Sequence, residues 1–334
     1  MPAPSPRQPI AEPDLPEVHV GRDGWLFLVG GSNRVLAQYG RPGLPRRALW
    51  RWRGLIAGRV RRCARLGARY LHAVAPEKLT VYPEHTDGLA YDPERAPALR
   101  LARWLRLSRG GGAWVDLVGA FRAARDGPPL YLRTDTHWTF EGCAVAYRAL
   151  CAAMGAAPRE DVVARRSEEA WPYAGDLGAK FDPPRAEPVR DTRFATAARR
   201  TYANPFLTAL EAAGRVGEAH LGAHAVFRND EPGIDTRRLV VFGDSFSQHS
   251  ATAPVATLTA FLADTFREVH FLWSTTIDWG YVERVRPDLV LGEVAERFMI
   301  DVPPAGFAIE RLAELAAERK GGDHKGGEPP SRDG

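Results

Sequence analysis

Ser245 is the first candidate for chemistry because of the segments on either side of it. The apolar run "RLVVFG" (238–243) predicts a buried strand, and a helix is expected at 251–264. A serine in such a turn would lie at the carboxyl edge of a sheet, where α/β proteins bind ligands. Its own N–H would then favour a developing oxyanion. The alternative is that Ser245 or Asp244 only caps the helix.

A second motif decides between these interpretations. Asp135 and His137 lie two residues apart, so in an extended segment both side chains point to the same side. The carboxylate would accept one imidazole N–H and leave the other nitrogen facing a nucleophile, as a Ser-His-Asp triad requires. Alone, this segment would be better explained by a surface histidine and a capping aspartate. Together with the Ser245 turn, it favours the triad.

The elements that must position these residues follow an α/β pattern, in which short apolar strands alternate with helical segments. Strands are expected at 24–30, 69–76, 113–117, 238–243, 268–273 and 287–294, and helices at 45–66, 94–107, 140–154, 251–264, 278–285 and 306–319. A mainly parallel sheet with helices on both faces is therefore predicted. Residues 159–237 interrupt the pattern and are expected to form an irregular insertion within a main domain spanning 19–318. The Pro-rich segment 1–18 and the Gly-rich segment 319–334 predict disordered tails.

Composition narrows the class of protein. The 334 residues are 45% hydrophobic and 26% charged, enough for one large core. The net charge of +4 comes with no nucleic-acid-binding motif, so no nucleic-acid partner is expected. Three cysteines without metal-ligand spacing predict neither a disulfide framework nor a metal site. The sequence contains no run of about 18 apolar residues, so no transmembrane segment is expected. The N-terminus lacks the apolar core of a signal peptide.

Several segments together resemble a known family. They are "GRDGWLFLVGG" (21–31), "VAPEKLTVYPE" (74–84), DTHW (135–138), GDSF (243–246) and "RVRPDLVLGEVAERF" (284–298). From about residue 20 to 300, the chain resembles the AlgX/AlgJ-type SGNH hydrolase-like domain of bacterial polysaccharide O-acetylation. Ordinary SGNH hydrolases place the serine first, whereas this family shares the order Asp, His, Ser found here. The resemblance implies a three-layer SGNH-like fold with permuted motif order.

The resemblance also implies roles and partners. Ser245 would be the nucleophile, His137 the general base and acid, and Asp135 the orienting carboxylate. An acetyl-serine would form and pass its acetyl group to a hydroxyl of a polysaccharide, with no cofactor. A membrane-bound O-acyltransferase would supply the acetyl group. The family implies a periplasmic location, with the cytoplasm as the alternative because no signal peptide is visible.

Further site residues are less defined by the sequence. The candidate oxyanion donors are the Ser245 backbone, Asn229, Ser274 and Thr275. For the last three, ordinary loop hydrogen bonds are the favoured alternative. The candidate substrate contacts are Lys78 and Tyr82, which match a family motif, and Trp138. The alternative for Lys78 and Tyr82 is that they lie in a turn held by two prolines. The alternative for Trp138 is that it is a buried core residue.

Two other polar segments are expected to be structural. Asp176 is expected to form a turn, and Glu296 with Arg297 an exposed ion pair of small energetic value.

Two alternative functions stay open. A serine esterase would use the same triad with water as the acceptor, and a non-catalytic carbohydrate-binding or assembly protein would keep only the fold.

Overall fold

A seven-stranded sheet forms the centre of the computed structural model, which describes residues 17–108, 110–164, 170–190, 196–248 and 257–322. Its strands run in the order β4 (Trp114–Val115), β3 (Arg69–Ala75), β11 (Leu289–Ala295), β9 (Asp235–Gly243), β10 (Phe266–Trp273), β8 (His224–Arg228) and β7 (Arg199–Ala203). The strands from β4 to β10 are parallel, and β8 and β7 extend that sheet as an antiparallel edge. The mainly parallel sheet that the sequence predicts is therefore confirmed.

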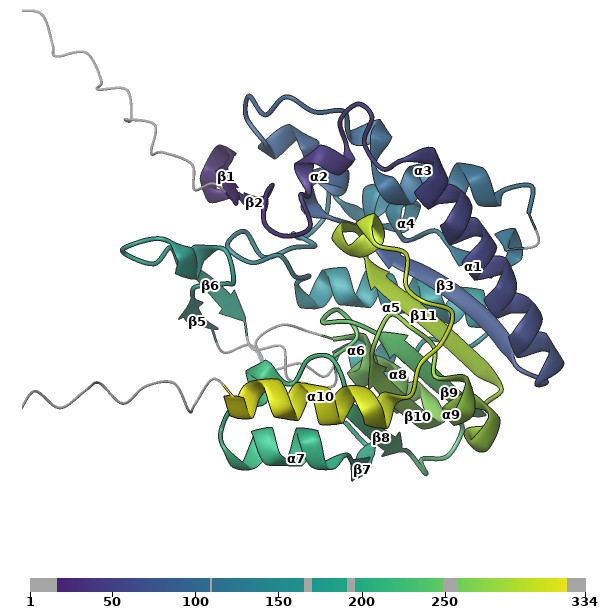
Figure 1. Cartoon of the computed structure of the whole chain (residues 1–334). Coiled ribbons are helices and arrows are strands. Elements are labelled where there is room, and N and C mark those ends of the chain that lie inside the picture. Colours follow the sequence, from purple (N-terminus) through teal and green to yellow (C-terminus); the bar gives the residue numbers. More distant parts are fainter. Residues whose placement is uncertain (1–16, 109, 165–169, 191–195, 249–256, 323–334) are drawn as a thin grey trace, which may run out of the picture.

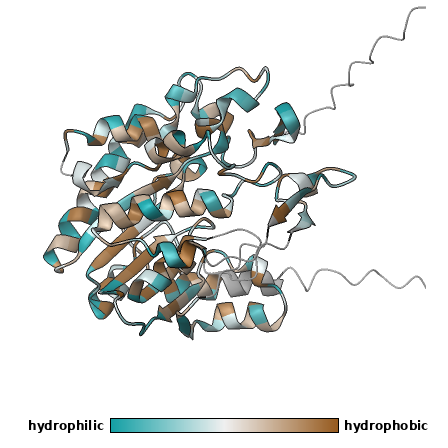
Figure 2. Ribbon diagram, turned by 180° about the vertical axis from the view of Figure 1, so that it is seen from behind, coloured by the Kyte–Doolittle hydropathy of each residue, from teal (hydrophilic) through white to brown (hydrophobic). Residues whose placement is uncertain are grey.

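Helices cover both faces of this sheet because its central strands are apolar on both sides. Along β9, Leu239 and Val241 belong to one core cluster, while Val240 and Phe242 belong to the other. The first face carries α4 (Leu117–Ala124), α5 (Phe140–Met154) and α8 (Leu258–Thr265), and the second carries α1 (Arg46–Arg65), α3 (Pro97–Leu105) and α9 (Trp279–Val285). Figure 1 shows this three-layer arrangement. In Figure 2 the strands are largely hydrophobic and the outer turns of the helices carry hydrophilic residues.

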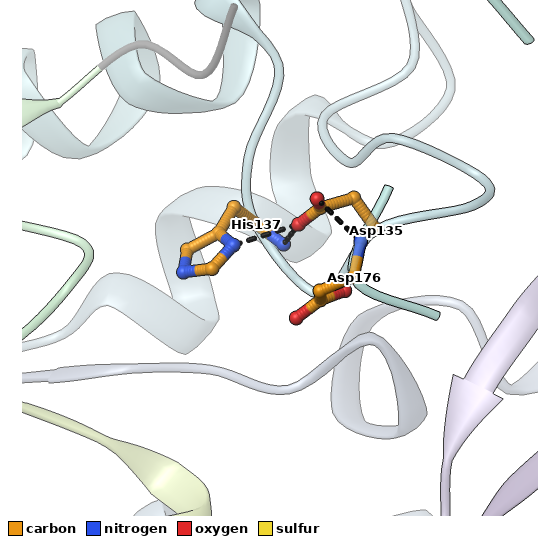
Figure 3. A group of neighbouring side chains, drawn as sticks. All are labelled: Asp135, His137 and Asp176. Carbon is orange, nitrogen blue, oxygen red and sulfur yellow. Dashed lines mark hydrogen bonds and ion pairs between the residues drawn. The ribbon is translucent and has the colours of Figure 1, made fainter. Parts of the chain in front are cut away.

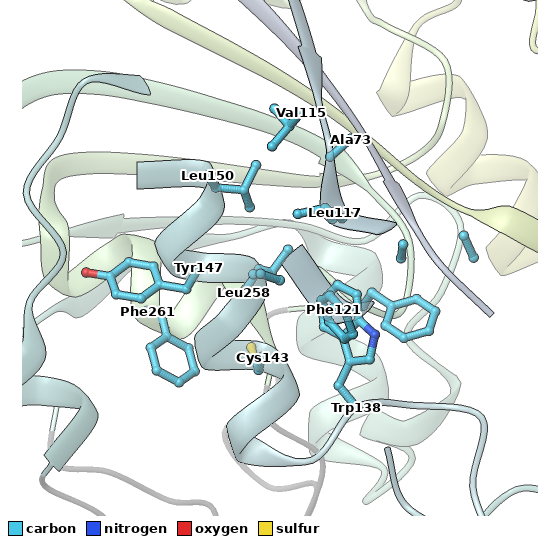
Figure 4. Packing of buried hydrophobic residues seen from close by; sticks show 14 of the residues in the cluster. Ala73, Val115, Leu117, Phe121, Trp138, Cys143, Tyr147, Leu150, Leu258 and Phe261 are labelled. Atoms are coloured by element: carbon cyan, nitrogen blue, oxygen red, sulfur yellow. The ribbon is translucent and has the colours of Figure 1, made fainter. Parts of the chain in front are cut away.

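The core under α5 reaches the loop that carries the candidate histidine. Tyr147 and Leu150 of α5 pack with Phe261 of α8 and with residues of the sheet, and Trp138 completes the same cluster (Figure 4). Trp138 has no exposed surface. The residue next to His137 is therefore an anchor in the core.

Most of the predicted elements are confirmed to within a few residues, among them α1, α5, β3, β10 and β11. The strand predicted at 24–30 is only partly right, because β2 (Leu26–Leu28) pairs with β1 (Val18–Val20) outside the central sheet. The helix predicted at 251–264 is described only from Leu258, and residues 249–256 lie outside the described residues. The C-terminal helix α10 (Ile309–Gly322) continues into the segment predicted as a tail.

The segment 159–237 is not only an insertion, because β7 and β8 join the central sheet. Most of β7 is exposed, so it lacks the apolar periodicity that would have revealed it. The segment also contains α6 (Glu160–Ala164), α7 (Pro205–Ala212) and a separate hairpin of β5 (Ala170–Tyr173) and β6 (Glu187–Arg190). None of the helices within the described ranges has the length and apolar character needed to cross a bilayer.

A buried carboxylate fixes the carboxyl end of β11 to its surroundings. Glu296 is fully buried, so the prediction of an exposed ion pair with Arg297 is wrong. Its carboxylate accepts from the hydroxyls of Tyr39 and Thr80, at 3.2 and 2.6 Å, and from two main-chain N–H groups. One of these is the Ala98 N–H in the first turn of α3, which has no partner within the helix. Burial raises the pKa of Glu296.

Replacing Glu296 with Leu should lower the free energy of unfolding by roughly 3–5 kcal/mol, because several buried donors lose their acceptor. Glu283→Leu is the matched control. Glu283 forms a half-exposed ion pair with Arg62 at 3.0 Å, which contributes about 0–1 kcal/mol. Urea unfolding of both variants measures the difference. Equal losses in the two variants would contradict a stabilising role for the Glu296 carboxylate.

Candidate active site

A short loop between two paired residues presents Asp135 and His137. Tyr131 and Trp138 form an isolated antiparallel bridge, and the main-chain N–H of Leu132 donates to the His137 carbonyl at 3.2 Å. Within the loop, the Asp135 carboxylate accepts the main-chain N–H of His137 at 2.8 Å. Such local turns are typical of aspartate. The two side chains are therefore brought together by a turn and not by the extended segment that the sequence predicted.

The structure brings Ser245, His137 and Asp135 together in one line of hydrogen bonds. His137 Nδ1 lies 2.7 Å from Asp135 Oδ1, and His137 Nε2 lies 2.8 Å from Ser245 Oγ. Figure 3 shows how the imidazole and the Asp135 carboxylate face each other. The carboxylate fixes the tautomer in which Nε2 can accept the serine proton. The side chain of His137 is 18% exposed and Ser245 is half-buried, so this line of hydrogen bonds is not fully enclosed by the core.

Asp135 and His137 stabilise each other's charged forms. Burial alone raises the pKa of Asp135, but the interactions with His137 and two main-chain N–H groups reverse this and hold it well below its usual range. Burial lowers the pKa of His137, but the Asp135 carboxylate more than offsets this effect, so the pKa is raised. Asp135 therefore stays ionised at neutral pH and stabilises a protonated imidazole.

Ser245 lies in a tight turn held by buried carboxyl groups. Asp244 accepts the N–H of Phe246 at 3.1 Å and that of Ala295 at 2.6 Å, and Glu293 accepts the N–H of Asp244 at 3.1 Å. Burial raises the pKa of both carboxyl groups, and Asp244 raises that of Glu293 further. The alternative that Ser245 or Asp244 caps the following helix does not hold for α8, whose N-cap position is Thr257.

Two aromatic residues hold the serine and histidine segments against each other. Trp138 follows His137, Phe246 follows Ser245, and the two ring centroids lie 4.6 Å apart. The His137 ring also lies over Phe246, with 5.0 Å between centroids. Contacts of this kind stabilise beyond the area they bury. Trp138 is therefore a buried anchor, and its predicted contact with a substrate is wrong.

Lys78 and Tyr82 are also buried, and neither is placed to touch a substrate directly. Both side chains are about 3% exposed. The Lys78 ammonium donates to the carbonyls of Leu132 and Arg133, at 3.1 and 3.0 Å, and so supports the loop that carries Asp135. Burial lowers the pKa of Lys78 to about 8, against the effect of nearby carboxylates. The Tyr82 hydroxyl accepts the main-chain N–H of Leu130 at 3.1 Å.

The candidate oxyanion donors fall in different places. The Ser245 N–H has no acceptor among the described residues. Asn229 lies at the opposite edge of the parallel strands, where its N–H donates to Arg267 at the start of β10, so that prediction is wrong. The buried Ser274 lies beside Gly243, but its hydroxyl donates to the Thr276 carbonyl at 3.0 Å. No hydrogen bond in the described part of the chain joins Thr275 to the Ser245 turn.

Three residues near the site were not predicted as part of it. The Asp176 N–H and the Tyr173 hydroxyl each donate to Asp135 Oδ2 at 3.0 Å. The buried Arg297 pairs with Glu77 at 2.9 Å and lies over the Phe246 ring. Arg297 lies two residues after the end of β11, the strand beside β9. This position could have identified it in the sequence as a residue near the Ser245 turn. For Asp176 and Tyr173 no comparable signal exists, because they lie in the irregular segment.

Gly175 allows this approach of the β5–β6 hairpin. A Cβ atom at that position would lie 2.4 Å from the Asp135 Cβ and 2.5 Å from the Thr134 carbonyl oxygen. Any side chain larger than hydrogen would push the hairpin and the Asp135 loop apart. The glycine is therefore required for the hydrogen bonds from Tyr173 and Asp176.

Asp135, His137 and Asp176 also form a group whose ligand atoms lie within 4.8 Å of one another. Their hydrogen bonds explain this closeness. Both Asp135 oxygens are engaged, and Asp176 accepts from the N–H of Thr136 at 2.7 Å and from its hydroxyl at 2.5 Å. The arrangement fits acid–base chemistry better than metal binding, and we assign no metal to it.

Residues 18–215 match the family model described as the SGNH hydrolase-like domain of the acetyltransferase AlgX. The match includes Asp135 and His137 and ends before Ser245. The probable alginate O-acetylases AlgJ of Pseudomonas aeruginosa and Pseudomonas syringae pv. tomato are 31% and 32% identical over 171 and 173 residues. Each match covers 48% of this chain and 40% of the relative, so well under half of each relative is represented.

Solved structures of two bacterial proteins share the fold. The O-acetyltransferase domain of Pseudomonas putida AlgJ gives a TM-score of 0.56 at 19% identity, covering 91% of this chain and 100% of that domain. Bacillus cereus PatB1 with a sulfonyl adduct gives a TM-score of 0.57 at 14% identity, covering 88% and 99%. The SGNH-like α/β fold expected from the sequence is thereby confirmed.

Replacing Asp135 with Asn should lower the pKa of His137, because the carboxylate charge that raises it is lost while burial still lowers it. The imidazole signals of His137, followed by NMR during a pH titration, measure the change. Asp230→Asn is the control, since Asp230 lies on the surface and pairs with Arg199 and Arg228. An unchanged His137 pKa in the Asp135 variant would contradict the described pairing.

Proposed function

Because the chain belongs to the AlgX family of SGNH hydrolase-like acetyltransferase domains, we propose that it transfers acetyl groups to hydroxyls of a polysaccharide through an acetyl-serine at Ser245. The observation that carries the proposal is the line of hydrogen bonds from Asp135 through His137 to Ser245. A neutral imidazole at this distance can take the hydroxyl proton as the oxygen attacks an acyl carbon.

In the first half of the reaction, Ser245 Oγ attacks the carbonyl carbon of the acetyl donor and His137 Nε2 takes the hydroxyl proton. The imidazolium that forms is stabilised by the ionised Asp135. The Ser245 N–H, which has no acceptor among the described residues, is proposed to donate to the oxyanion of the tetrahedral intermediate. The intermediate then collapses, its C–O bond to the donor breaks, and His137 returns the proton to the leaving oxygen.

In the second half, a hydroxyl of the acceptor takes the place of the leaving group. His137 removes its proton, the acceptor oxygen attacks the acetyl-serine, and the ester bond to Oγ breaks. The proton returns through His137 to Ser245. Water in the same position would release acetate, so the identity of the acceptor alone separates transfer from hydrolysis.

The acceptor and donor follow from the relatives. The curated relatives are named for alginate O-acetylation, so we propose a bacterial polysaccharide as the acceptor. The acetyl group is proposed to come from a membrane-bound O-acyltransferase, as the family resemblance implies. Asp135, His137 and Ser245 are the proposed catalytic residues, and Lys78, Trp138 and Phe246 are proposed to position them.

Incubation with a chromogenic acetyl ester should add one acetyl group to the wild-type protein, as measured by intact mass, and none to Ser245→Ala. Turnover of the ester should fall on the order of 10⁴-fold in this variant. An oligosaccharide acceptor should discharge the adduct and gain the acetyl group. The control is Ser32→Ala, an exposed serine outside the site.

Three outcomes would contradict parts of this proposal. An adduct that persists in Ser245→Ala would exclude this serine as the nucleophile. Ester turnover with no transfer to any sugar would identify an esterase. Neither adduct nor turnover would favour a non-catalytic role.

The value of kcat/KM for ester turnover should rise with pH, because only the neutral form of His137 can accept the serine proton. Since the pKa of His137 is raised, the midpoint should lie above 6.5, the ordinary value for histidine. In Asp135→Asn the remaining activity should show a lower midpoint. A pH-independent rate, or a wild-type midpoint below the ordinary value, would exclude His137 as the base.

A further inference from the structure

An apolar cavity of about 910 Å³ lies between α7, α10 and the β7–β8 edge of the sheet, and no residue of the Ser245 site lines it. Figure 1 shows α7 and α10 side by side along this edge. Its apolar walls include Phe206, Ala209 and Leu210 of α7, Val226 of β8, and Ile309 and Ala313 of α10. The volume matches sites for small molecules, which range over roughly 300–1,000 Å³.

The charged and amide groups around the cavity already have partners. Arg215 pairs with Glu218 at 2.7 Å, Glu310 with Arg284 at 3.1 Å, and Glu314 with Arg311 at 3.0 Å. The amide of Asn204 donates to the Gly222 carbonyl and accepts main-chain N–H groups of Leu207 and His224. These groups therefore leave no free charge to attract an ionic ligand.

His224 differs from these groups because a chain of hydrogen bonds that begins at Glu268 determines which of its nitrogens carries the proton. Glu268 Oε1 lies 2.7 Å from His270 Nε2 and 2.6 Å from Arg238 Nε. His270 Nδ1 is hydrogen bonded to the Tyr281 hydroxyl, and that hydroxyl lies 2.8 Å from His224 Nε2. Burial lowers the pKa of both histidines, that of His224 to about 3. Both imidazoles are thus neutral at pH 7.

The direction of each bond follows from the carboxylate. Glu268 can only accept, so His270 Nε2 carries the proton and His270 Nδ1 accepts from Tyr281. The Tyr281 oxygen then accepts from His224 Nε2. The remaining nitrogen of His224, Nδ1, is left with a lone pair, and no described residue donates to it. His224 is 7% exposed and belongs to the cavity wall. The wall therefore contains an acceptor that no described residue satisfies.

We propose that this cavity binds a small uncharged apolar molecule that carries a hydroxyl group, which donates to His224 Nδ1. The apolar body would fill the space between α7 and α10, and the hydroxyl would satisfy the acceptor that the hydrogen bonds from Glu268 create. A carboxylic acid fits less well, because its ionised form has no proton to donate to His224 Nδ1.

Isothermal titration calorimetry with three probes of equal chain length tests the proposal on the full chain. 1-Octanol should bind, octyl methyl ether should bind roughly three- to tenfold more weakly because it lacks the donor, and octanoate should bind more weakly than the alcohol. Ala209→Trp adds an indole to an exposed wall residue and should abolish binding of 1-octanol. Thr208→Trp is the matched control, since Thr208 is exposed on the same helix and does not line the cavity.

His224→Phe separates the hydrogen bond from the apolar contact. In this variant the affinity for 1-octanol should fall to that for the ether, and the affinity for the ether should not change. Should His224→Phe not fold, the contrast between alcohol and ether and the two tryptophan variants still decide. Equal affinity of the wild type for alcohol and ether, no binding of the alcohol, or full binding by Ala209→Trp would overturn the proposal. Self-association lost in Ala209→Trp, measured by sedimentation, would instead assign this face to a second copy of the chain.

Discussion

The contact between Trp138 and Phe246 joins the two halves of the candidate site. His137 and Ser245 are 108 residues apart in the chain, and each is followed directly by one of these rings. Both rings are buried in the core that α5 and α8 form against the sheet. The hydrophobic effect is not directional. It nevertheless brings His137 and Ser245 to hydrogen-bonding distance, because the residues next to them, Trp138 and Phe246, are buried in the same core. The polar chemistry thus depends on apolar contacts.

Around this contact, the carboxyl ends of the strands hold three buried carboxyl groups. Asp244, Glu293 and Glu296 lie beneath the serine turn and the adjacent loops, and burial raises the pKa of each. Main-chain N–H groups at turns and at the start of α3 offset part of the desolvation cost. Burying carboxyl groups costs stability, but each one accepts at least one main-chain N–H and so fixes its direction. These hydrogen bonds hold the serine turn against the end of β11.

Periodicity and local motifs were enough to predict the layers of the fold and the three central residues. Strands such as β9 and β11 are apolar on both faces, so their burial is visible in the sequence. The motif that contains Lys78 and Tyr82 does not reveal which way their side chains point, and both are buried. The hydrogen bonds of Tyr173 and Asp176 come from an irregular segment whose path depends on contacts distant in sequence. The tautomer of His224 likewise depends on a relay across strands and helix α9, which no local pattern encodes.

The close approach of the β5–β6 hairpin to the Asp135 loop requires a glycine at position 175, which can be recognised in a sequence. The hairpin that contains it approaches the Asp135 loop so closely that a methyl group would overlap the aspartate's own side chain. During divergence, the position can change only if the hairpin moves away and the carboxylate loses its two outer donors. The sequence signature is an Asp-x-His motif followed later in the chain by Tyr-x-Gly-Asp. It identifies relatives in which a tyrosine hydroxyl and an aspartate N–H donate to the carboxylate of the Asp-x-His motif. Chains with a larger residue there must orient it by another route.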